Sequence, residues 1–452
     1  MNNSRDMTKG NPTGLIVRFA MPLIIGNIFQ QLYTVTDAAI VGKGVGLNAL
    51  AAIGTTDWLI WLFFGMVQGS AQGFSVLVSQ VFGAADGKRL KNMRAMSEIL
   101  SVIVTAAVML FGLLAQPLMF NLLNIPAEVY EMAKAYYIII VLGLPCFMFY
   151  NLYASLLRAI GNSRIPFIAI VVASLTNIAL DSIAVFVLKM GIRGAAYATV
   201  FAQLISGIIC FIPVVRSKDL KYQRSELELT FDEASALLKI GLPIAAQNLV
   251  ISIGGVVMTS VVNSFGTAFI AGFISANKLY GLLEIAALSF GLAVTTYVGQ
   301  NYGAGKIDRI REGTFASIKI SLVIAVVMGG LVTIFARQLC GLFISSDDIA
   351  IANEALGTGA FYLRLMGIFL TVLYMIYILR FSLQGMGDSV SSLVSAGVEL
   401  VIRVIASITA GALGTPRLII WTEIMAWIGG FTVVLIAFIK RMKKLRLVSE
   451  DE

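Results

Sequence analysis

Long apolar runs recur along the whole chain and constrain its fold more than any other feature. Each run holds about 20 to 30 residues, enough to cross the ~30 Å hydrocarbon core of a bilayer as a helix. Ten-residue segments of alternating polarity, which are typical of membrane barrels, do not appear. We therefore predict an all-α integral membrane protein with twelve transmembrane helices, at 15–41, 50–78, 97–120, 133–157, 165–188, 194–215, 237–262, 268–298, 314–339, 356–383, 390–413 and 418–439.

Composition excludes several other classes of protein. The chain is 58% hydrophobic and 13% charged, and its net charge of +8 comes from basic residues in short loops, so we expect no nucleic-acid partner. There is no histidine, and no grouping of a nucleophile with a base is visible, so we expect no enzyme. Cys146, Cys210 and Cys340 are far apart and have no metal-binding spacing. We expect no cofactor.

The distribution of basic residues predicts the orientation. Lysines and arginines gather before the first span and after the second, fourth, sixth, eighth and twelfth, whereas the intervening loops hold only scattered ones. Cytoplasmic loops carry this excess, so both termini are predicted to be cytoplasmic. The polar N-terminus lacks the pattern of a cleaved signal peptide, so the first span is expected to remain.

Three pairs of short motifs indicate an internal repeat. They are FAMPLIIGN (19–27) with IGLPIAAQN (240–248), VSQVFGA (78–84) with VGQNYGA (298–304), and LLRAIGNS (156–163) with SLQGMGDS (382–389). We predict an N-terminal lobe of six helices (1–215), a cytoplasmic linker (216–235) and a C-terminal lobe of six helices (236–452) that ends in a short basic and acidic tail. An even number of spans per half makes the repeat parallel, which is an architecture of transporters.

Two aspartates inside membrane spans are candidates for cation chemistry. Asp37 lies in the first span, and Asp181 lies in the fifth, one helical turn from Asn177. Counting residues from the outer ends places both at similar depth to Thr199 of the sixth span. Intramembrane carboxylates usually face the protein interior and mark ion or proton paths. The group is suited to H⁺ or Na⁺, and the alternative is that Asn177 and Thr199 only form a hydrogen bond between helices.

The C-terminal half carries charges of a different kind. Glu399 and Arg403 are four residues apart, which predicts an internal ion pair within one helix. The roles of Glu284 and Glu423 stay open, because one of them could instead pair with Lys278. They are candidates to line a substrate cavity and to favour cations, together with Gln30 and Tyr33 of the first span.

These motifs resemble those of the multidrug and toxic compound extrusion (MATE) transporters, most closely the DinF-like prokaryotic branch. The resemblance covers the whole chain and rests on the motif pairs above, on TDAAIVG after Pro22, and on NIALD followed by GAAYAT. It implies a V-shaped exporter with two pseudo-symmetric lobes. It also implies a cation site formed by Asp37, Tyr136, Asn177, Asp181 and Thr199, and a first span that bends at Pro22. The second sodium site of the NorM-type branch is not expected, because spans seven and ten hold no acid.

We therefore expect a secondary active multidrug exporter that exchanges H⁺ or Na⁺ for amphipathic, often cationic organic compounds by alternating access. We expect a multi-pass monomer in the plasma membrane of a prokaryote, with drug-like small molecules and membrane lipids as its partners. Any Na⁺ would be bound by Asp37, Asn177, Asp181 and Thr199. The alternatives are a flippase for lipid-linked oligosaccharides, which would need an arginine-rich cavity, and a passive channel or receptor.

Overall fold

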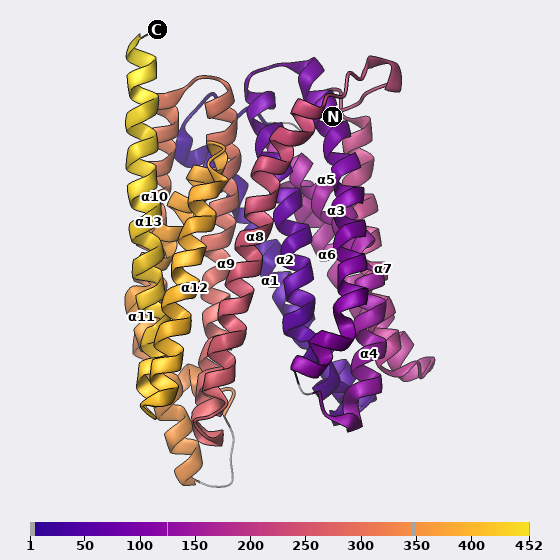
Figure 1. Ribbon diagram of the computed structural model, residues 1–452, viewed down its shortest axis with the longest axis vertical. Coiled ribbons are helices and arrows are strands. Elements are labelled where there is room, and N and C mark those ends of the chain that lie inside the picture. The colour runs from indigo at the N-terminus through magenta and orange to yellow at the C-terminus, as the bar shows by residue number, and fades with distance from the viewer. Residues whose placement is uncertain (1–4, 124, 345–348, 452) are drawn as a thin grey trace. The chain divides into compact units, whose positions relative to one another are not determined.

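The computed structural model describes residues 5–123, 125–344 and 349–451, and every regular element in these ranges is helical. The outermost residues of the predicted lobes, 1–4 and 452, lie outside them. Figure 1 shows the helices, which are α1 (Pro12–Gly44), α2 (Leu47–Gly83), α3 (Gly87–Leu122), α4 (Ala127–Leu142), α5 (Leu144–Ala159), α6 (Arg164–Ser182), α7 (Gly191–Arg216), α8 (Phe231–Val262), α9 (Thr267–Gly303), α10 (Ile307–Gly341), α11 (Ile349–Gly385), α12 (Ser389–Ala412) and α13 (Pro416–Asp451). A π-helical turn (Ile183–Val187) and a 3₁₀ turn (Arg224–Glu226) complete the set.

Within the described residues, 11 helices are long and apolar enough to cross a membrane, or 12 spans if the bent pair α4 and α5 counts as one. The predicted all-α membrane architecture is confirmed. Several helices extend beyond the predicted spans, because polar residues at a membrane surface can continue a helix that an apolar run begins.

The fourth predicted span, 133–157, is not one straight helix. α4 and α5 meet at Gly143 with an angle of 43° between them. Pro145 follows within the first turn of α5, and its missing N–H and its clash with the preceding backbone disfavour a continuous helix at this point. The break gives the two halves of the span different directions.

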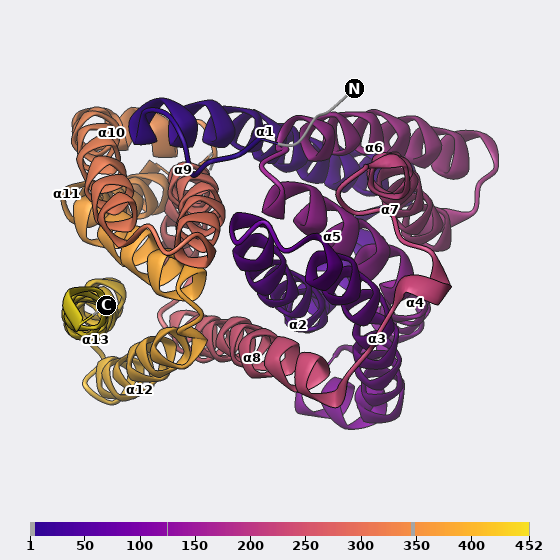
Figure 2. The ribbon, with the colours of Figure 1, turned by 90° about the horizontal axis from the view of Figure 1, so that it is seen from above.

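The chain divides into two compact units, each with its own hydrophobic core. Of the described residues, unit 1 contains 5–9, 18–123, 125–249 and 299–305. In it α2 packs against α3, α4 and α5, and α7 packs against α5 and α6. Figure 2 shows α5 inside this unit, with α2, α6 and α7 beside it. The arrangement places α6 and α7 next to each other in the part of the unit that holds the candidate site.

Of the described residues, unit 2 contains 10–17, 250–298, 306–344 and 349–451. In it α10 packs along α11, and α13 packs against α11 and α12. Its core includes Trp427, Tyr362 and Tyr374, which are almost completely buried. The two lobes expected from the sequence, 1–215 and 236–452, are each one continuous segment, and they stay a prediction. Each compact unit instead combines several segments, which alternate along the sequence.

Glycines explain why parts of α8 and α9 belong to unit 1. A Cβ added at Gly73 would lie 2.4 Å from the Cα of Gly241, so α2 and α8 approach backbone to backbone. The repeated motifs VSQVFGA and VGQNYGA also meet reciprocally. A Cβ at Gly83 would lie 1.9 Å from the carbonyl oxygen of Gln300, and one at Gly303 would lie 1.7 Å from that of Gln80. Only glycine permits these approaches.

Candidate cation site in unit 1

Asn177 and Asp181 form the buried side of the candidate site. They lie four residues apart on α6, so their side chains share one face of the helix. Asn177 is 1% exposed and Asp181 is 0% exposed. The amide nitrogen of Asn177 donates to the hydroxyl of Thr199 on α7 over 3.5 Å, a long hydrogen bond. The structure therefore brings Asn177 of α6 and Thr199 of α7 together.

Asp37 reaches the same place from α1. Its carboxyl group is near enough to that of Asp181 for the two groups to interact electrostatically. Among the described residues, four buried oxygens of this group accept no hydrogen bond, namely Oδ1 of Asp37, both carboxyl oxygens of Asp181, and Oδ1 of Asn177. Buried polar atoms nearly always have a partner, so four orphaned oxygens from three neighbouring residues are unusual.

This set of oxygens fits a small cation or a proton. Two carboxylates close together in a low-dielectric interior repel each other, and a bound cation or a shared proton relieves that repulsion. Carboxylate, amide and hydroxyl oxygens are also the ligand types that hard cations prefer. Within the described part of the chain, no three His, Cys, Asp or Glu side chains form a metal-binding group, so the donors do not resemble a transition-metal site.

Two tyrosines surround the carboxylates. Tyr136 of α4 is 7% exposed and interacts electrostatically with both Asp37 and Asp181, and its role in a cation site stays a prediction. Tyr33 lies one turn before Asp37 on α1 and interacts with the same two acids. The two phenol groups therefore lie within electrostatic range of both carboxyl groups.

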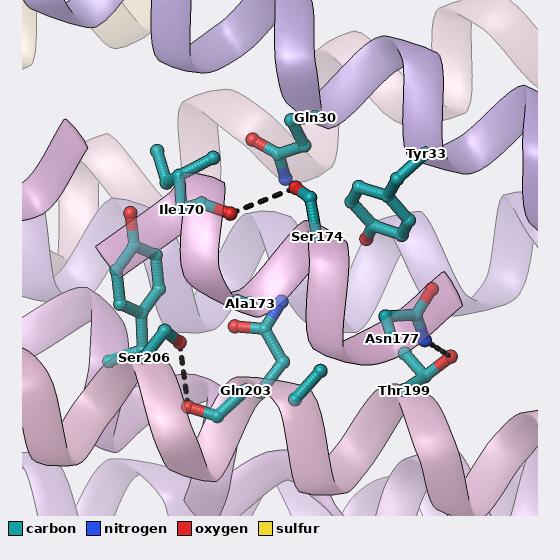
Figure 3. Close-up of a pocket in the computed structure, with 11 residues that line it drawn as sticks. Gln30, Tyr33, Ile170, Ala173, Ser174, Asn177, Thr199, Gln203 and Ser206 are labelled. Carbon is teal, nitrogen blue, oxygen red and sulfur yellow. Dashed lines mark hydrogen bonds between the residues drawn. The ribbon is translucent and has the colours of Figure 1, made fainter. Parts of the chain in front are cut away.

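A small cavity adjoins this group between α1, α5, α6 and α7. Figure 3 shows Gln30 and Tyr33 approaching from α1, opposite Ser174 and Asn177 of α6, with Gln203 of α7 beside them. Its volume of about 20 Å³ holds roughly one water molecule. Drug pockets generally need about 300 Å³ or more, so this cavity suits an ion or a water. The role of Gln30 and Tyr33 toward a larger substrate stays a prediction.

A local distortion follows the two polar residues of α6. After Ser182 the helix continues as the π turn Ile183–Val187, and such turns are frequent at functional sites. A Cβ added at Gly44 would lie 2.3 Å from Val185, so the end of α1 packs tightly against this turn. The absence of a side chain at Gly44 brings the part of α1 that carries Asp37 close to the part of α6 that carries Asp181.

The buried charges of unit 2 are paired. The predicted ion pair between Glu399 and Arg403 of the same helix is present at 3.9 Å, and Glu399 has a second, closer partner in Arg380 of α11. Arg403 also donates to Glu423 of α13 over 2.9 Å. Side chains from neighbouring helices compete with those of the same helix, and here the interhelical partners are nearer.

The remaining acid of unit 2, Glu284 on α9, accepts a hydrogen bond from the hydroxyl of Tyr377. It therefore has a neutral partner, unlike Glu423, whose charge is balanced by Arg403. The predicted contribution of Glu284 and Glu423 to a substrate cavity stays a prediction.

Sequence reasoning missed two charged residues inside the spans. Asp57 of α2 interacts electrostatically with Asp37, and Arg380 is the partner of Glu399. Asp37 was selected because it is a charged residue inside an apolar run. The same rule would have selected Asp57 in GTTDWLI and Arg380 in YILRFSL. The π turn has no comparable signal in the sequence.

Comparisons with known proteins agree on one family. The MatE family model matches residues 22–183 and 243–409. The chain is 29% identical over 367 residues to the probable multidrug resistance protein YpnP of Bacillus subtilis (strain 168), covering 80% of this chain and 82% of the relative. It is 22% identical over 414 residues to the multidrug export protein MepA of Staphylococcus aureus (strain MSSA476), covering 91% of this chain and 90% of the relative.

Solved structures show the same fold. One of them, described as the outward-facing conformation of a multidrug resistance MATE family transporter of the MOP superfamily, matches with a TM-score of 0.89 at 25% identity. The match covers 97% of this chain and 98% of that chain.

Proposed function

The chain belongs to the MatE family, as its motifs predicted, and from this premise we propose that it is a secondary active exporter driven by H⁺ or Na⁺. It is a multi-pass membrane protein, and the likeness to solved MATE structures agrees with the predicted fold. In this proposal the protein carries small organic molecules, and it catalyses no covalent reaction.

One observation carries the proposal. Asp37, Asp181 and Asn177 bring four buried oxygens without hydrogen-bond partners to one place in unit 1. Such a group is unfavourable unless a proton or a cation occupies it for part of the transport cycle. An ion that binds there from outside enters along its gradient, and a membrane potential of 100 mV adds about 2.3 kcal/mol per elementary charge that moves inward.

We propose that α1 couples this event to the rest of the protein. Pro22 lies inside α1 and cannot donate the backbone hydrogen bond that would otherwise reach the carbonyl of Arg18. A helix with this gap bends more easily, so occupation of Asp37 near one end can change the helix as a whole. The carrier then exposes its substrate to the opposite side of the membrane.

The substrate class and location are part of the same proposal. Relatives named for multidrug resistance and export support small, drug-like substrates. The bacterial sources of these relatives support the plasma membrane, and the distribution of basic residues supports cytoplasmic termini. We propose a monomer that acts with H⁺ or Na⁺ and without a further cofactor.

Reconstitution into proteoliposomes tests the proposal. Efflux of the fluorescent cation ethidium is measured under an imposed pH gradient, an imposed Na⁺ gradient, or neither. We expect one of the gradients to drive efflux in the wild type and Asp37→Asn to lose the response. Glu128→Gln is the matched control, because Glu128 is an exposed acid at the start of α4 and lies outside the site.

The proposal is wrong if the wild type moves ethidium equally with and without gradients, since that result describes a passive pathway. It is also wrong if Asp37→Asn retains the full response to the gradient, because the carboxylate pair would then have no part in coupling.

A further inference from the structure

A hollow of about 720 Å³ lies between the start of α1 and the first turns of α10. Both segments belong to unit 2, and Figure 2 shows the first residues of α1 beside α10. The wall of the hollow carries charges of both signs and one aromatic ring. It includes Thr13 of α1 and Asp308, Arg311, Glu312, Phe315 and Lys319 of α10. We call this the α10 hollow.

The charges of the α10 hollow lie in two neighbouring rows, because residues four apart line up along a helix. Asp308 and Glu312 form the acidic row, and Arg311, Phe315 and Lys319 form the basic row. All five side chains are exposed. The guanidinium carbon of Arg311 lies 5.9 Å from the centre of the Phe315 ring. Among the residues that the structure describes, none of the four charged side chains forms a salt bridge, so the protein itself does not neutralise them.

The basic row continues into the membrane. Val323 and Val327 occupy its next two positions, and they are 64% and 54% exposed, as side chains that face lipid are. Lys319 lies five residues inside the predicted span 314–339, about 8 Å along the helix. A lysine at this depth extends its apolar stem along the helix and turns its ammonium group toward the membrane surface. The α10 hollow therefore lies at the level of the lipid headgroups, next to a surface for lipid chains.

We propose that the α10 hollow binds the headgroup of a phospholipid that carries both a phosphate and a primary ammonium group, as phosphatidylethanolamine does. Arg311 and Lys319 are the partners of the phosphate, since both donate charge-assisted hydrogen bonds to its oxygens. Asp308 and Glu312 are the partners of the lipid ammonium group. The lipid belongs to the leaflet on the side of the N-terminus, which is predicted to be cytoplasmic. This binding is independent of the exported substrate and of the coupling ion.

Charge complementarity selects this occupant. A headgroup with both charges can meet the two rows at once, whereas an anionic lipid such as phosphatidylglycerol leaves the acidic row without a partner and is repelled by it. A choline headgroup has the same charges, but its quaternary nitrogen has no N–H to donate to Glu312. A free phosphate ester lacks the chains that would cover Val323 and Val327, so it gains nothing from the apolar part of the row.

Lipid binding to the purified full-length protein tests the inference. The protein in detergent is mixed with equal amounts of phosphatidylethanolamine, phosphatidylcholine and phosphatidylglycerol that carry identical chains. Native mass spectrometry then measures the fraction of the protein that retains each lipid. We expect the wild type to retain phosphatidylethanolamine most. Glycerophosphoethanolamine, which has the same headgroup without chains, should not bind at concentrations at which the lipid does.

Variants separate the two rows. Arg311→Gln should weaken binding of phosphatidylethanolamine roughly fivefold, which corresponds to about 1 kcal/mol for one basic residue near a membrane surface. Glu312→Gln should abolish the preference for phosphatidylethanolamine over phosphatidylcholine and should strengthen binding of phosphatidylglycerol. Arg193→Gln and Glu128→Gln are the matched controls, because they remove exposed charges from the starts of α7 and α4 in unit 1. Both should retain the three lipids as the wild type does. Melting temperatures should be the same for all, since every substituted side chain is exposed.

Four results overturn the inference. The first two are equal retention of the three lipids by the wild type, and stronger retention of phosphatidylglycerol than of phosphatidylethanolamine. The third is binding of glycerophosphoethanolamine as tight as that of the lipid, which would identify the ligand as a soluble phosphate ester. The fourth is an equal loss in Arg311→Gln and in Arg193→Gln, because the attraction would then be spread over the basic surface. None of these results bears on the exporter proposal, since no residue of the α10 hollow belongs to the candidate cation site.

Discussion

The buried charges of unit 2 allow a sharp prediction about stability. Glu399 is 4% exposed and is the close partner of Arg380, which is also 4% exposed. Glu399→Gln leaves Arg380 without its carboxylate and removes the second acid near Arg403. Breaking a buried pair by removing one partner costs about 3 to 5 kcal/mol. Glu423→Gln should cost less, about 2 kcal/mol, because Arg403 keeps Glu399 at 3.9 Å.

The assay is thermal or denaturant unfolding of the purified variants in one detergent. We expect the order wild type, Glu423→Gln, Glu399→Gln from most to least stable. The double variant Glu399→Gln with Arg380→Met should recover part of the loss, because it removes the stranded charge. A Glu399→Gln protein that unfolds like the wild type would refute the pairing. So would a Glu423→Gln protein that is the less stable of the two single variants.

Three further predictions concern backbone and linker. Gly430→Ala should destabilise the protein, since its Cβ would lie against Glu399, whereas Gly397→Ala, which meets nothing within 4 Å, should be neutral or slightly stabilising in the same melting assay. Pro22→Ala restores a backbone hydrogen bond within α1, so it should not lower the melting temperature. The stiffer helix should lower gradient-driven efflux. Unchanged efflux would contradict the role proposed for Pro22. In the linker, burial and then the hydrogen bond to Glu98 raise the pKa of Tyr222 from 10.0 to about 12, so its contribution to stability is complete below pH 10 and disappears as the pH rises to 12. Tyr222→Phe should lack this part of the alkaline loss of melting temperature.

The sequence predicted the features that follow from periodicity and depth. Apolar runs located the spans because each must cover the membrane thickness. Asn177, Asp181 and Asp37 could be grouped because a four-residue spacing fixes a helix face and a residue count fixes depth. The choice of partners across helices could not be predicted in this way, because it depends on helix rotation. Arg380 is therefore a partner of Glu399 that the sequence did not predict, in addition to Arg403.

Two local features of the structure were also not predicted from the sequence. The fourth span breaks at Gly143, although its apolar run is continuous, because Gly143 and Pro145 together disfavour a straight helix. Asp57 was present in the second run but was overlooked, and only its exposure on α2 and its interaction with Asp37 distinguish it from an acid that is paired within the core.

Substrate affinity measured against pH and against Na⁺ tests the central claim most directly, with choline chloride keeping the ionic strength constant. If Asp37 and Asp181 hold the coupling ion and the ion competes with substrate, tetraphenylphosphonium should bind the wild type more weakly as either H⁺ or Na⁺ increases. In Asp37→Asn the affinity should no longer depend on that ion. An ion dependence in Asp37→Asn equal to that of the wild type would contradict the account.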